Sequence, residues 1–449
     1  MMDLGVRMMF MCLVWCCVVA CAVGDQVYYS CVVDSGSTGN RLYLYRITSA
    51  FRFRDGFDEL SSRKLGSKEN PWHFEMAKET KNKKPLAKAE SAQEALSDLM
   101  DKAKSWLAKL GVDVAKTPIY LGATGGVRKL PARRVAKIMA SVEEYLGQSG
   151  FRYKKDFGRM LSGEEEGAFA WAAVEYLRRG ENEDIGALDL GGASTQIAAK
   201  EDDILEGLFV LNAQPYHTER LFARSFLYFG ADGYADQLYD HLVDKASRQK
   251  KKKLKSKCYR EYKQPCLPRG YGKELIRDGK VYCFNGTSNP GDCDKLTGEV
   301  MLPLLPPKVP CMQGSQDTNQ CSLHGSYIPE FLPRKRFLAF NAFFHLWKFY
   351  DQTTEGTVNS ILSKSVSICG YDHDSLKKYA AERDALNEHL YTRCLLTYYV
   401  KYLLGNAYHF DLDKTLIQAV DKIENVSASW ALGLAIYQNY WFQVDKRFD

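Results

Sequence analysis

The chain has 449 residues, of which 45% are hydrophobic, and carries a formal net charge of +6. This length exceeds one compact core, and the apolar content is that of folded proteins, so we expect two domains and exclude a largely disordered chain. Much of the excess charge lies in one basic run, 248–257, without interleaved aromatic residues, which excludes an obvious nucleic-acid-binding protein. A solvated loop is expected there, with contact to an anionic surface as the alternative.

The first 24 residues have the pattern of a secretory signal peptide. Arg7 precedes an uninterrupted apolar run over 8–23, and a cleavage site is plausible after Ala22 or Gly24. The run is shorter than the ~20 residues that a membrane span needs, so a cleaved signal is favoured over an anchor. We therefore expect a secreted protein, or one in the lumen of the secretory pathway. A membrane-anchored form is the alternative.

Two stretches of the chain repeat one pattern. An apolar strand ends at Asp34, a Gly-, Ser- and Thr-rich turn follows, and a second strand returns; the same order recurs at Asp189. Each stretch predicts a hairpin with a carboxylate at its tip. Turn amides and hydroxyls suit phosphate oxygens, and a carboxylate beside them suits a divalent cation. Either stretch alone is consistent with an ordinary hairpin, but the recurrence favours two tips that bind a polyphosphate and its metal from both sides.

The chain between the two hairpins alternates strand and helix signals. A polar, basic connector over 52–84 has few signals of either kind, and a helix is expected over 86–110. A short buried strand is expected over 118–121, and a second helix from Pro131 to Gly147. This order indicates an α/β domain with helices packed on a mixed sheet.

Two turns in this region are candidate ligand sites. The glycine-rich turn 122–126 could bind an anion through helix-start amides, with Thr124 as the hydroxyl, although a tight connection is equally consistent. Ser162 and Glu165 predict a capping box at a helix N-terminus, which gives the acidic residues there a structural role. The glycine after Glu166 weakens a helix but would leave room for a ligand, so that Glu166 could act as general base on a water.

The second half of the chain mixes regular elements with an insertion rich in Cys, Pro and Gly. Strand-like segments at 208–211 and 220–229 precede a helix expected over 232–245, and 258–321 is expected to be a loop-like insertion. The aromatic stretch 337–347 is expected in the core, with base stacking by one or two side chains as the alternative. The last two helices are expected over 394–408 and 427–437.

The thirteen cysteines fall into three groups. Four lie in the signal segment, and Cys31 is expected to be a buried free thiol. The other eight predict disulfides of open connectivity, and a metal site is disfavoured because no Cys-x-x-Cys spacing occurs. These eight are Cys258, Cys266, Cys283, Cys293, Cys311, Cys321, Cys369 and Cys394. Asn285 and Asn425 begin glycosylation acceptor sequences if the chain enters the secretory route.

Five motifs in order resemble those of the apyrases, the nucleoside triphosphate diphosphohydrolases. They are Asp34–Arg41, Gly122–Arg128, Leu161–Gly167 with Trp171, Ala187–Gln196 and Ser429–Gly433. The resemblance implies an α/β, actin-like and RNase H-like fold of two domains, with the active site in the cleft between them. We expect domain I over 25–161 plus 421–449, and domain II over 162–420, with the insertion 258–321. The resemblance also implies hydrolysis of nucleoside tri- and diphosphates by direct attack of water, with Ca²⁺ or Mg²⁺.

The resemblance assigns roles to individual residues. Glu166 would be the general base, Gln196 would help to place the nucleophilic water, and Thr124 would act with them and contact phosphate. Asp34 and Asp189 would hold the metal through water. The residues expected to bind phosphate in the two turns are Ser35, Gly36, Ser37, Thr38, Gly39, Gly191, Gly192, Ala193 and Ser194. In-line attack on a phosphoryl group needs positioning and charge neutralisation, which these residue types supply.

The chain departs from the family pattern at the base-binding positions. One family aromatic falls near Phe344 or His345, and the other is replaced by Arg393, whose planar cation could stack on a base. Gly125 stands where family members usually carry alanine, and Trp430 would lie near the metal and the phosphates. The sequence shows no C-terminal span like those of cell-surface relatives, so we expect the chain to group with soluble or luminal members.

The favoured hypothesis is therefore a secreted or luminal apyrase that acts on nucleoside di- and triphosphates. The first alternative is a nucleotide- or glycan-binding receptor with little turnover, which the intact Glu166 and both aspartates disfavour. The second is an exopolyphosphatase on the same fold, which secretion and the disulfide set disfavour. A phosphate-release assay with nucleotides and polyphosphate discriminates among the three.

Overall fold

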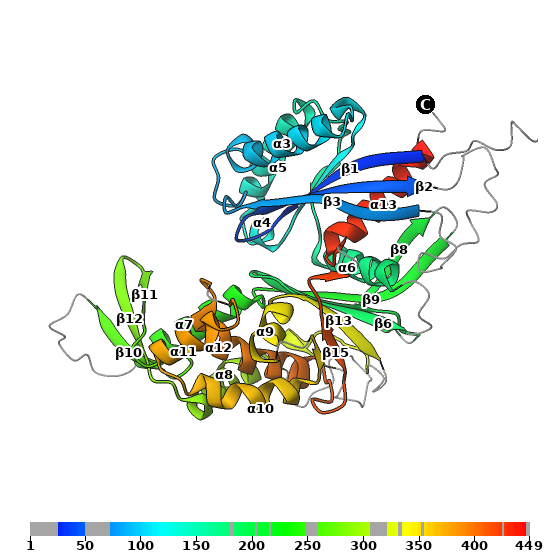
Figure 1. Cartoon of the computed structure of the whole chain (residues 1–449). Helices are drawn as coiled ribbons and strands as arrows, with labels where there is room; N and C mark the ends of the chain where they lie inside the picture. Colours follow the sequence, from blue (N-terminus) through cyan, green and yellow to red (C-terminus); the bar gives the residue numbers. More distant parts are fainter. Residues whose placement is uncertain are drawn as a thin grey trace, which may run out of the picture.

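The computed structural model describes residues 26–49, 72–178, 184–202, 204–214, 217–247, 258–305, 321–330, 335–351, 354–385, 387–423 and 426–445. The expected signal segment, the basic run and the Asn425 acceptor lie outside these ranges. Two large mixed sheets with helices packed on them form the framework, which confirms the α/β prediction (Figure 1). Within the described ranges, every helix is too short or too polar to cross a bilayer.

The first sheet has the order β3-β2-β1-β4-β5. Its strands are β1 (Gln26–Ser35), β2 (Asn40–Ser49), β3 (Trp72–Asn82), β4 (Ile119–Ala123) and β5 (Gly158–Met160). The absence of strand signals over 52–84 was misleading, because β3 pairs with β2 along its whole length. As an edge strand, β3 buries few side chains and is held by its backbone ladder, so its sequence lacks an apolar alternation.

The second sheet has the order β14-β15-β13-β6-β7-β9-β8. Its strands are β6 (Ile185–Leu190), β7 (Ser194–Ala199), β8 (Leu208–Gln214), β9 (His217–Leu227), β13 (Arg336–Asn341), β14 (Glu355–Gly356) and β15 (Ile417–Ala419). The meander β6-β7-β9-β8 is antiparallel, whereas β13 and β15 run parallel to β6 on its other side.

The two sheets share one plan. In each, the predicted hairpin begins an antiparallel meander, and two strands parallel to its first strand extend the sheet on the other side. The repeated pattern at Asp34 and Asp189 therefore occupies equivalent places in two similar halves. This arrangement is the one expected of two RNase H-like halves.

Helices form three layers on the two sheets (Figure 1). Helices α3 (Ala92–Lys109) and α5 (Ala132–Gly147) pack on the outer face of the first sheet. Helices α6 (Gly163–Leu177) and α13 (Trp430–Asp445) lie between the sheets in one apolar cluster. The two helices pack closely at Gly433, where any side chain would collide with the α6 backbone. A Cβ added there would lie 1.9 Å from the carbonyl oxygen of Phe169.

The remaining helices cover the outer face of the second sheet or connect elements. They are α4 (Gly125–Arg128), α7 (Ala231–Ser247), α8 (Pro290–Met301), α9 (Ala342–Asp351), α10 (Val358–Cys369), α11 (His373–Ala381) and α12 (Arg393–Tyr402). Single turns of 3₁₀-helix occur at Val114–Lys116, Leu302–Leu304, Leu323–Gly325 and Leu390–Thr392, and a short ribbon pairs β16 (Lys422–Ile423) with β17 (Val426–Ser427). The helix expected over 394–408 changes to a π-turn at Leu403–Ala407.

The insertion is more regular than expected. Instead of a loop, a three-stranded sheet forms from β10 (Arg260–Gln264), β11 (Gly272–Arg277) and β12 (Lys280–Gly286). Its hairpin turns at Asp278 and Gly279, both with positive φ, as a two-residue turn between twisted strands requires. The positions of β11 alternate between exposed and half-buried, and none is fully buried, so the strand lacks the buried apolar residues that would have predicted it.

Disulfides hold this part of the chain together, as predicted. The bonds are Cys258–Cys283, Cys266–Cys293 and Cys369–Cys394, and Cys321 is also disulfide-bonded. Cys31 is a buried free thiol, which confirms its prediction. Cys311 lies outside the described residues.

The division into 25–161 plus 421–449 and 162–420 stays a prediction. Helices α6 and α13 fall on opposite sides of that division and pack on each other between the sheets. The two halves thus share a common apolar layer, and their first hairpins meet at one end of it.

Candidate active site

The two predicted hairpin tips contact each other. A Cβ added to Gly192 would lie 2.7 Å from Ser37 Oγ, and one added to Gly126 would lie 2.7 Å from Ser37 Cα. The contact at Gly126 is with backbone, so glycine is required there, whereas a Cβ at Gly192 would displace the side chains of Ser37 and Asp232. The three glycine-rich turns at 36–39, 122–126 and 191–194 therefore meet at one place.

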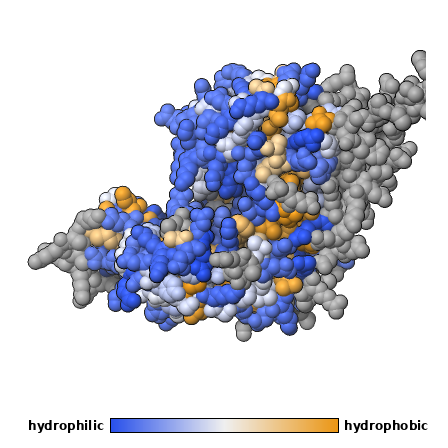
Figure 2. Space-filling model, in the orientation of Figure 1, coloured by the Kyte–Doolittle hydropathy of each residue, from blue (hydrophilic) through white to orange (hydrophobic). Residues whose placement is uncertain are grey.

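A cleft of about 880 Å³ opens at this meeting point. In the space-filling view, the molecule is hollowed between its upper and lower halves, and largely hydrophilic residues surround the hollow (Figure 2). The predicted site residues that line the cleft are Asp34, Gly36, Ser37, Thr38, Gly39, Thr124, Glu166, Gly191, Gly192, Ala193, Ser194, His345, Arg393 and Trp430. Residues from five separate motifs are thus gathered around one cavity.

Four predicted site residues lie behind this lining or away from it. Asp189 and Gln196 are buried beside it and contact residues that line it. The Ser35 hydroxyl donates to Asn40 Oδ1 at 2.6 Å, so it is engaged within the protein and not directed at a phosphate. Phe344 is half-buried against the apolar core, with Lys348 over its ring.

The capping box at the start of α6 directs Glu166 into the cleft. Ser162 Oγ accepts from the Glu165 amide at 3.0 Å, and Glu165 Oε2 accepts from the Ser162 amide at 2.8 Å. Glu165 therefore serves the helix end, as predicted, and the next residue projects inward. The expectation that Gly167 makes room for a ligand is wrong. A Cβ added to Gly167 would point toward β7 and lie 3.5 Å from Gln196 Cβ, so this side of the helix faces the sheet and not the cleft.

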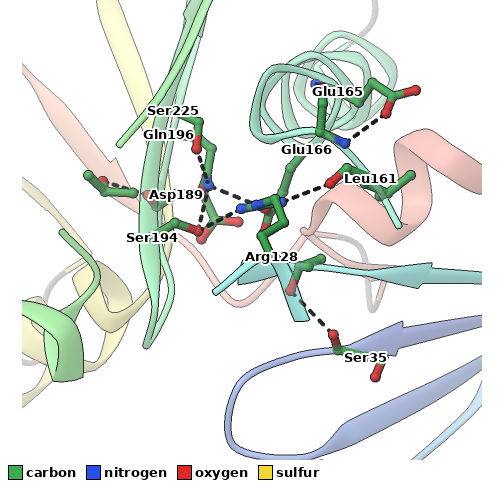
Figure 3. A network of polar contacts seen from close by, with 12 residues as sticks. Ser35, Arg128, Leu161, Glu165, Glu166, Asp189, Ser194, Gln196 and Ser225 are labelled. Carbon is green, nitrogen blue, oxygen red and sulfur yellow. Dashed lines mark hydrogen bonds and ion pairs between the residues drawn. The ribbon is translucent and has the colours of Figure 1, made fainter. Parts of the chain in front are cut away.

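One oxygen of Glu166 is held by two donors. Arg128 Nη2 lies 2.7 Å from Glu166 Oε2, and Gln196 Nε2 donates to the same oxygen at 3.2 Å (Figure 3). Among the described residues, Oε1 has no donor. The carboxylate is thus fixed in orientation while its second oxygen stays available to a water.

Arg128 is one of two site residues that sequence reasoning missed. Its Nη2 also donates to Ser194 Oγ at 2.9 Å, and its Nη1 donates to the Leu161 carbonyl at 3.1 Å. It is the last residue of α4 and joins three motifs with one buried side chain (Figure 3). Its position four residues after Thr124, one helical turn away, was the available signal.

Burial sets the protonation of Glu166. Desolvation raises its pKa from 4.5 to about 7, Arg128 opposes the rise, and the charges of Asp189 and Asp34 add to it. A general base is most effective when its pKa lies near the working pH, so this environment suits a base at neutral pH.

Asp34, which is half-buried, and Asp189, which is buried, are carboxylates that repel each other. Burial raises the pKa of Asp34 to about 6, Arg41 lowers it, and Asp189 raises it further. Burial also raises the pKa of Asp189, against a hydrogen bond of 2.6 Å from Asn341 Nδ2. Asn341 is the second site residue that the sequence did not reveal. It is the last residue of β13 and has a left-handed backbone conformation, which places its side-chain amide beside Asp189.

A divalent cation between these carboxylates would relieve their repulsion. In the described ranges, no group of three or more His, Cys, Asp or Glu side chains could hold a metal ion alone. Two carboxylates fit a hard cation such as Ca²⁺ or Mg²⁺ whose other ligands are water and phosphate oxygens. The donor set therefore fits a metal that binds together with its substrate.

Comparison with known proteins agrees with this chemistry. A family model described as GDA1/CD39 (nucleoside phosphatase) matches residues 21–448. The chain is 25% identical to probable apyrase 6 of Arabidopsis thaliana over 437 residues, covering 91% of this chain and 72% of that protein. It is 27% identical to ectonucleoside triphosphate diphosphohydrolase 2 of Gallus gallus over 454 residues, covering 90% and 81%.

Among solved structures, the chain is similar to a Ppx/GppA family member from Aquifex aeolicus. The TM-score is 0.48 and the identity 10%, over 93% of this chain and 99% of that one. The family match spans both hairpins, the glutamate turn and the final helix, which are the elements that build the cleft. The chain therefore belongs to the GDA1/CD39 (nucleoside phosphatase) family.

Proposed function

We propose that this protein hydrolyses the terminal anhydride bond of nucleoside tri- and diphosphates, with Glu166 as the general base. Its family makes it a nucleotide-hydrolysing enzyme, and the relatives above are named apyrases and nucleoside triphosphate diphosphohydrolases. The observation that carries the assignment of Glu166 is its geometry. It is buried at the cleft, with Oε2 held by Arg128 and Gln196 and with Oε1 left for a water.

The two glycine-rich turns would bind the phosphates from opposite sides. Both turns line the cleft, and their hydroxyl residues Ser37, Thr38 and Ser194 are among the lining residues. Ser194 Oγ already accepts from Arg128 and from Gln196, at 2.9 Å each. Its own O–H therefore points away from those donors and can donate a hydrogen bond to a phosphate oxygen.

The attacking water would lie between Glu166 and Gln196. Gln196 Oε1 is buried and has no partner among the described residues, so it can accept a hydrogen bond from this water. As the water oxygen bonds to the terminal phosphorus, Glu166 takes the proton. The anhydride P–O bond breaks, and its electron pair stays on the bridging oxygen of the leaving nucleotide.

We propose that Asp34 and Asp189 hold Ca²⁺ or Mg²⁺ through water molecules. The ion would supply charge neutralisation for the phosphates when it is bound. Arg41 lies near both carboxylates and lowers their pKa values, which helps to keep them ionised and ready to bind it.

We also propose that the protein works in an oxidising compartment, either secreted or luminal. Disulfides persist outside the cytosol, and the described residues contain three. The Asn285 acceptor lies near the end of β12 in this disulfide-bonded region.

A nucleotide panel tests the proposed activity. Phosphate release from ATP, ADP, GDP and UDP is measured with Ca²⁺, with Mg²⁺ and with a chelator. We expect release with either ion or both, and none with the chelator. Binding of nucleotide without release would indicate the receptor, and release from polyphosphate alone would indicate the exopolyphosphatase.

A further inference from the structure

The side-chain amide of Gln196 lies beside more acceptors than it has hydrogens to donate. Its Nε2 is 2.9 Å from Ser194 Oγ, 3.0 Å from Ser225 Oγ and 3.2 Å from Glu166 Oε2 (Figure 3). A side-chain amide has two N–H groups, so only two of these oxygens can be bound well at one time. The pair that is bound sets the tilt of the planar amide, and with it the direction of Oε1 at its other end. These acceptors therefore influence the water that Oε1 is proposed to hold.

Two of the three acceptors change during the proposed reaction. Glu166 is a strong acceptor while it is ionised, and it loses its charge when it takes the proton of the water. Ser194 lines the cleft, and its Oγ is shared with Arg128 Nη2 at 2.9 Å and with the expected phosphate. Ser225 differs from both, because its hydroxyl stays neutral and because, although it is described, it is not part of the cleft lining. It is the acceptor that stays the same throughout.

The fold holds Ser225 in this position from two sides. Ser225 is half-buried on β9 and lies directly opposite Gln196 of β7 in the antiparallel ladder, so the two side chains share one face of the sheet. On the other side lies Gly163, the first residue of α6. A Cβ added to Gly163 would lie 2.2 Å from Ser225 Oγ, so the missing side chain makes room for the hydroxyl between the helix and β7. This contact explains a glycine of the Leu161–Gly167 motif that the catalytic proposal does not use.

We propose that Ser225 is a positioning residue that keeps the Gln196 amide, and with it Oε1, directed at the attacking water while the proton moves to Glu166. The inference rests on the hydrolysis proposed above and deepens it, because it names the group that holds Gln196. Ser225 would not touch the substrate. We therefore expect it to act on kcat and not on substrate binding.

The test measures kcat and KM for phosphate release in the wild type, Ser225→Ala, Gln196→Ala and the double variant, with whichever nucleotide the wild type hydrolyses fastest. The loss of one ordinary hydrogen bond corresponds to about a threefold to tenfold effect, so Ser225→Ala should lower kcat by this factor. Its KM should stay within about twofold of the wild-type value. In the Gln196→Ala background, Ser225→Ala should change kcat by less than about twofold, because the amide that Ser225 holds is gone.

Two further variants support the comparison. Ser225→Cys keeps the size of the side chain but offers a weaker acceptor, so its kcat should lie between the wild type and Ser225→Ala. Thr218→Ala is the matched control on the same strand. Thr218 is exposed, and its hydroxyl donates to Asn212 Oδ1 at 3.1 Å, so its loss should leave kcat and KM at the wild-type values. Thermal unfolding of each variant shows whether it is folded.

Three results would overturn the inference. One is a normal kcat in Ser225→Ala, and another is a rise of KM that accounts for the whole loss, which would assign Ser225 to substrate binding. The third is a loss in the double variant equal to the product of the two single losses, since Ser225 would then act independently of Gln196. Any of these in an active enzyme refutes the inference alone. A wild type that releases no phosphate from any nucleotide would refute the proposed hydrolysis, and the inference with it.

Discussion

Replacing Glu166 with glutamine tests the catalytic proposal and its electrostatic basis together. The change keeps the shape of the side chain but removes its ability to take a proton. We expect phosphate release to fall by about 10²–10⁴-fold, the usual contribution of a general base, while nucleotide binding is retained. Near-normal hydrolysis would remove Glu166 from its role.

The same variant should change how stability depends on pH. The pKa of Glu166 is raised from 4.5 to about 7 in the folded protein, so the folded state holds this proton more tightly than the unfolded chain. At about 1.4 kcal/mol for each pKa unit, the difference corresponds to ~3 kcal/mol. Stability from this group is therefore present below about pH 4.5 and is lost as pH rises to about 7.

The assay is urea unfolding in chelator, without nucleotide, at several values between about pH 5 and pH 8. The wild type should lose up to ~3 kcal/mol over this range relative to Glu166→Gln, because glutamine has no charge to bury. Glu164→Gln, in the same turn and half-exposed, is the control and should follow the wild type. If the free energy of unfolding changed with pH in the same way for the wild type and Glu166→Gln, the conclusion that Glu166 binds its proton more tightly in the folded protein would be refuted.

Three further predictions concern the surroundings of the site. Arg128→Met removes the cation that lowers the pKa of Glu166, so the acidic limb of the kcat–pH profile should move to higher pH. If Arg128 had only a structural role, kcat would fall without a shift of that limb. Gly433→Ala should destabilise the fold by about 3 kcal/mol in urea unfolding, because its Cβ would meet the α6 backbone at 1.9 Å, while Gly291→Ala in α8 should be neutral or stabilising. Removal of divalent ions should abolish phosphate release and lower the melting temperature only when nucleotide is present, and release that persists in chelator would contradict a metal-dependent site.

Local sequence patterns were sufficient for the parts of the site that local chemistry defines. Asp34 and Asp189 end short apolar strands before glycine-rich turns, and such turns form hairpins wherever they occur. The Ser162–Glu165 capping box likewise depends only on residues three apart, and the structure shows both of its hydrogen bonds. These features were predicted because the atoms that stabilise them are close in the chain.

Contacts between distant segments were beyond the reach of sequence patterns. Arg128 meets Glu166 across 38 positions and Ser194 across 66, so no local signal ties them together. The polar edge strand β3 was missed for a related reason, since its partner strand, and not its own side chains, stabilises it.

The sequence by itself determined the two carboxylate-tipped hairpins and the Ser162–Glu165 capping box, because each follows from residues that are neighbours along the chain. It indicated disulfides but left their pairing open, since the bonded cysteines are 25 or 27 positions apart. Only the tertiary structure decided which oxygen of Glu166 is free, that Asn341 donates to Asp189, and that the Nε of Arg393 is buried without a partner in the part of the chain that the structure describes. Burial and the pairing of polar groups are properties of the packed molecule. They depend on which distant segments exclude water from a side chain, and that is set when the two halves close on the cleft.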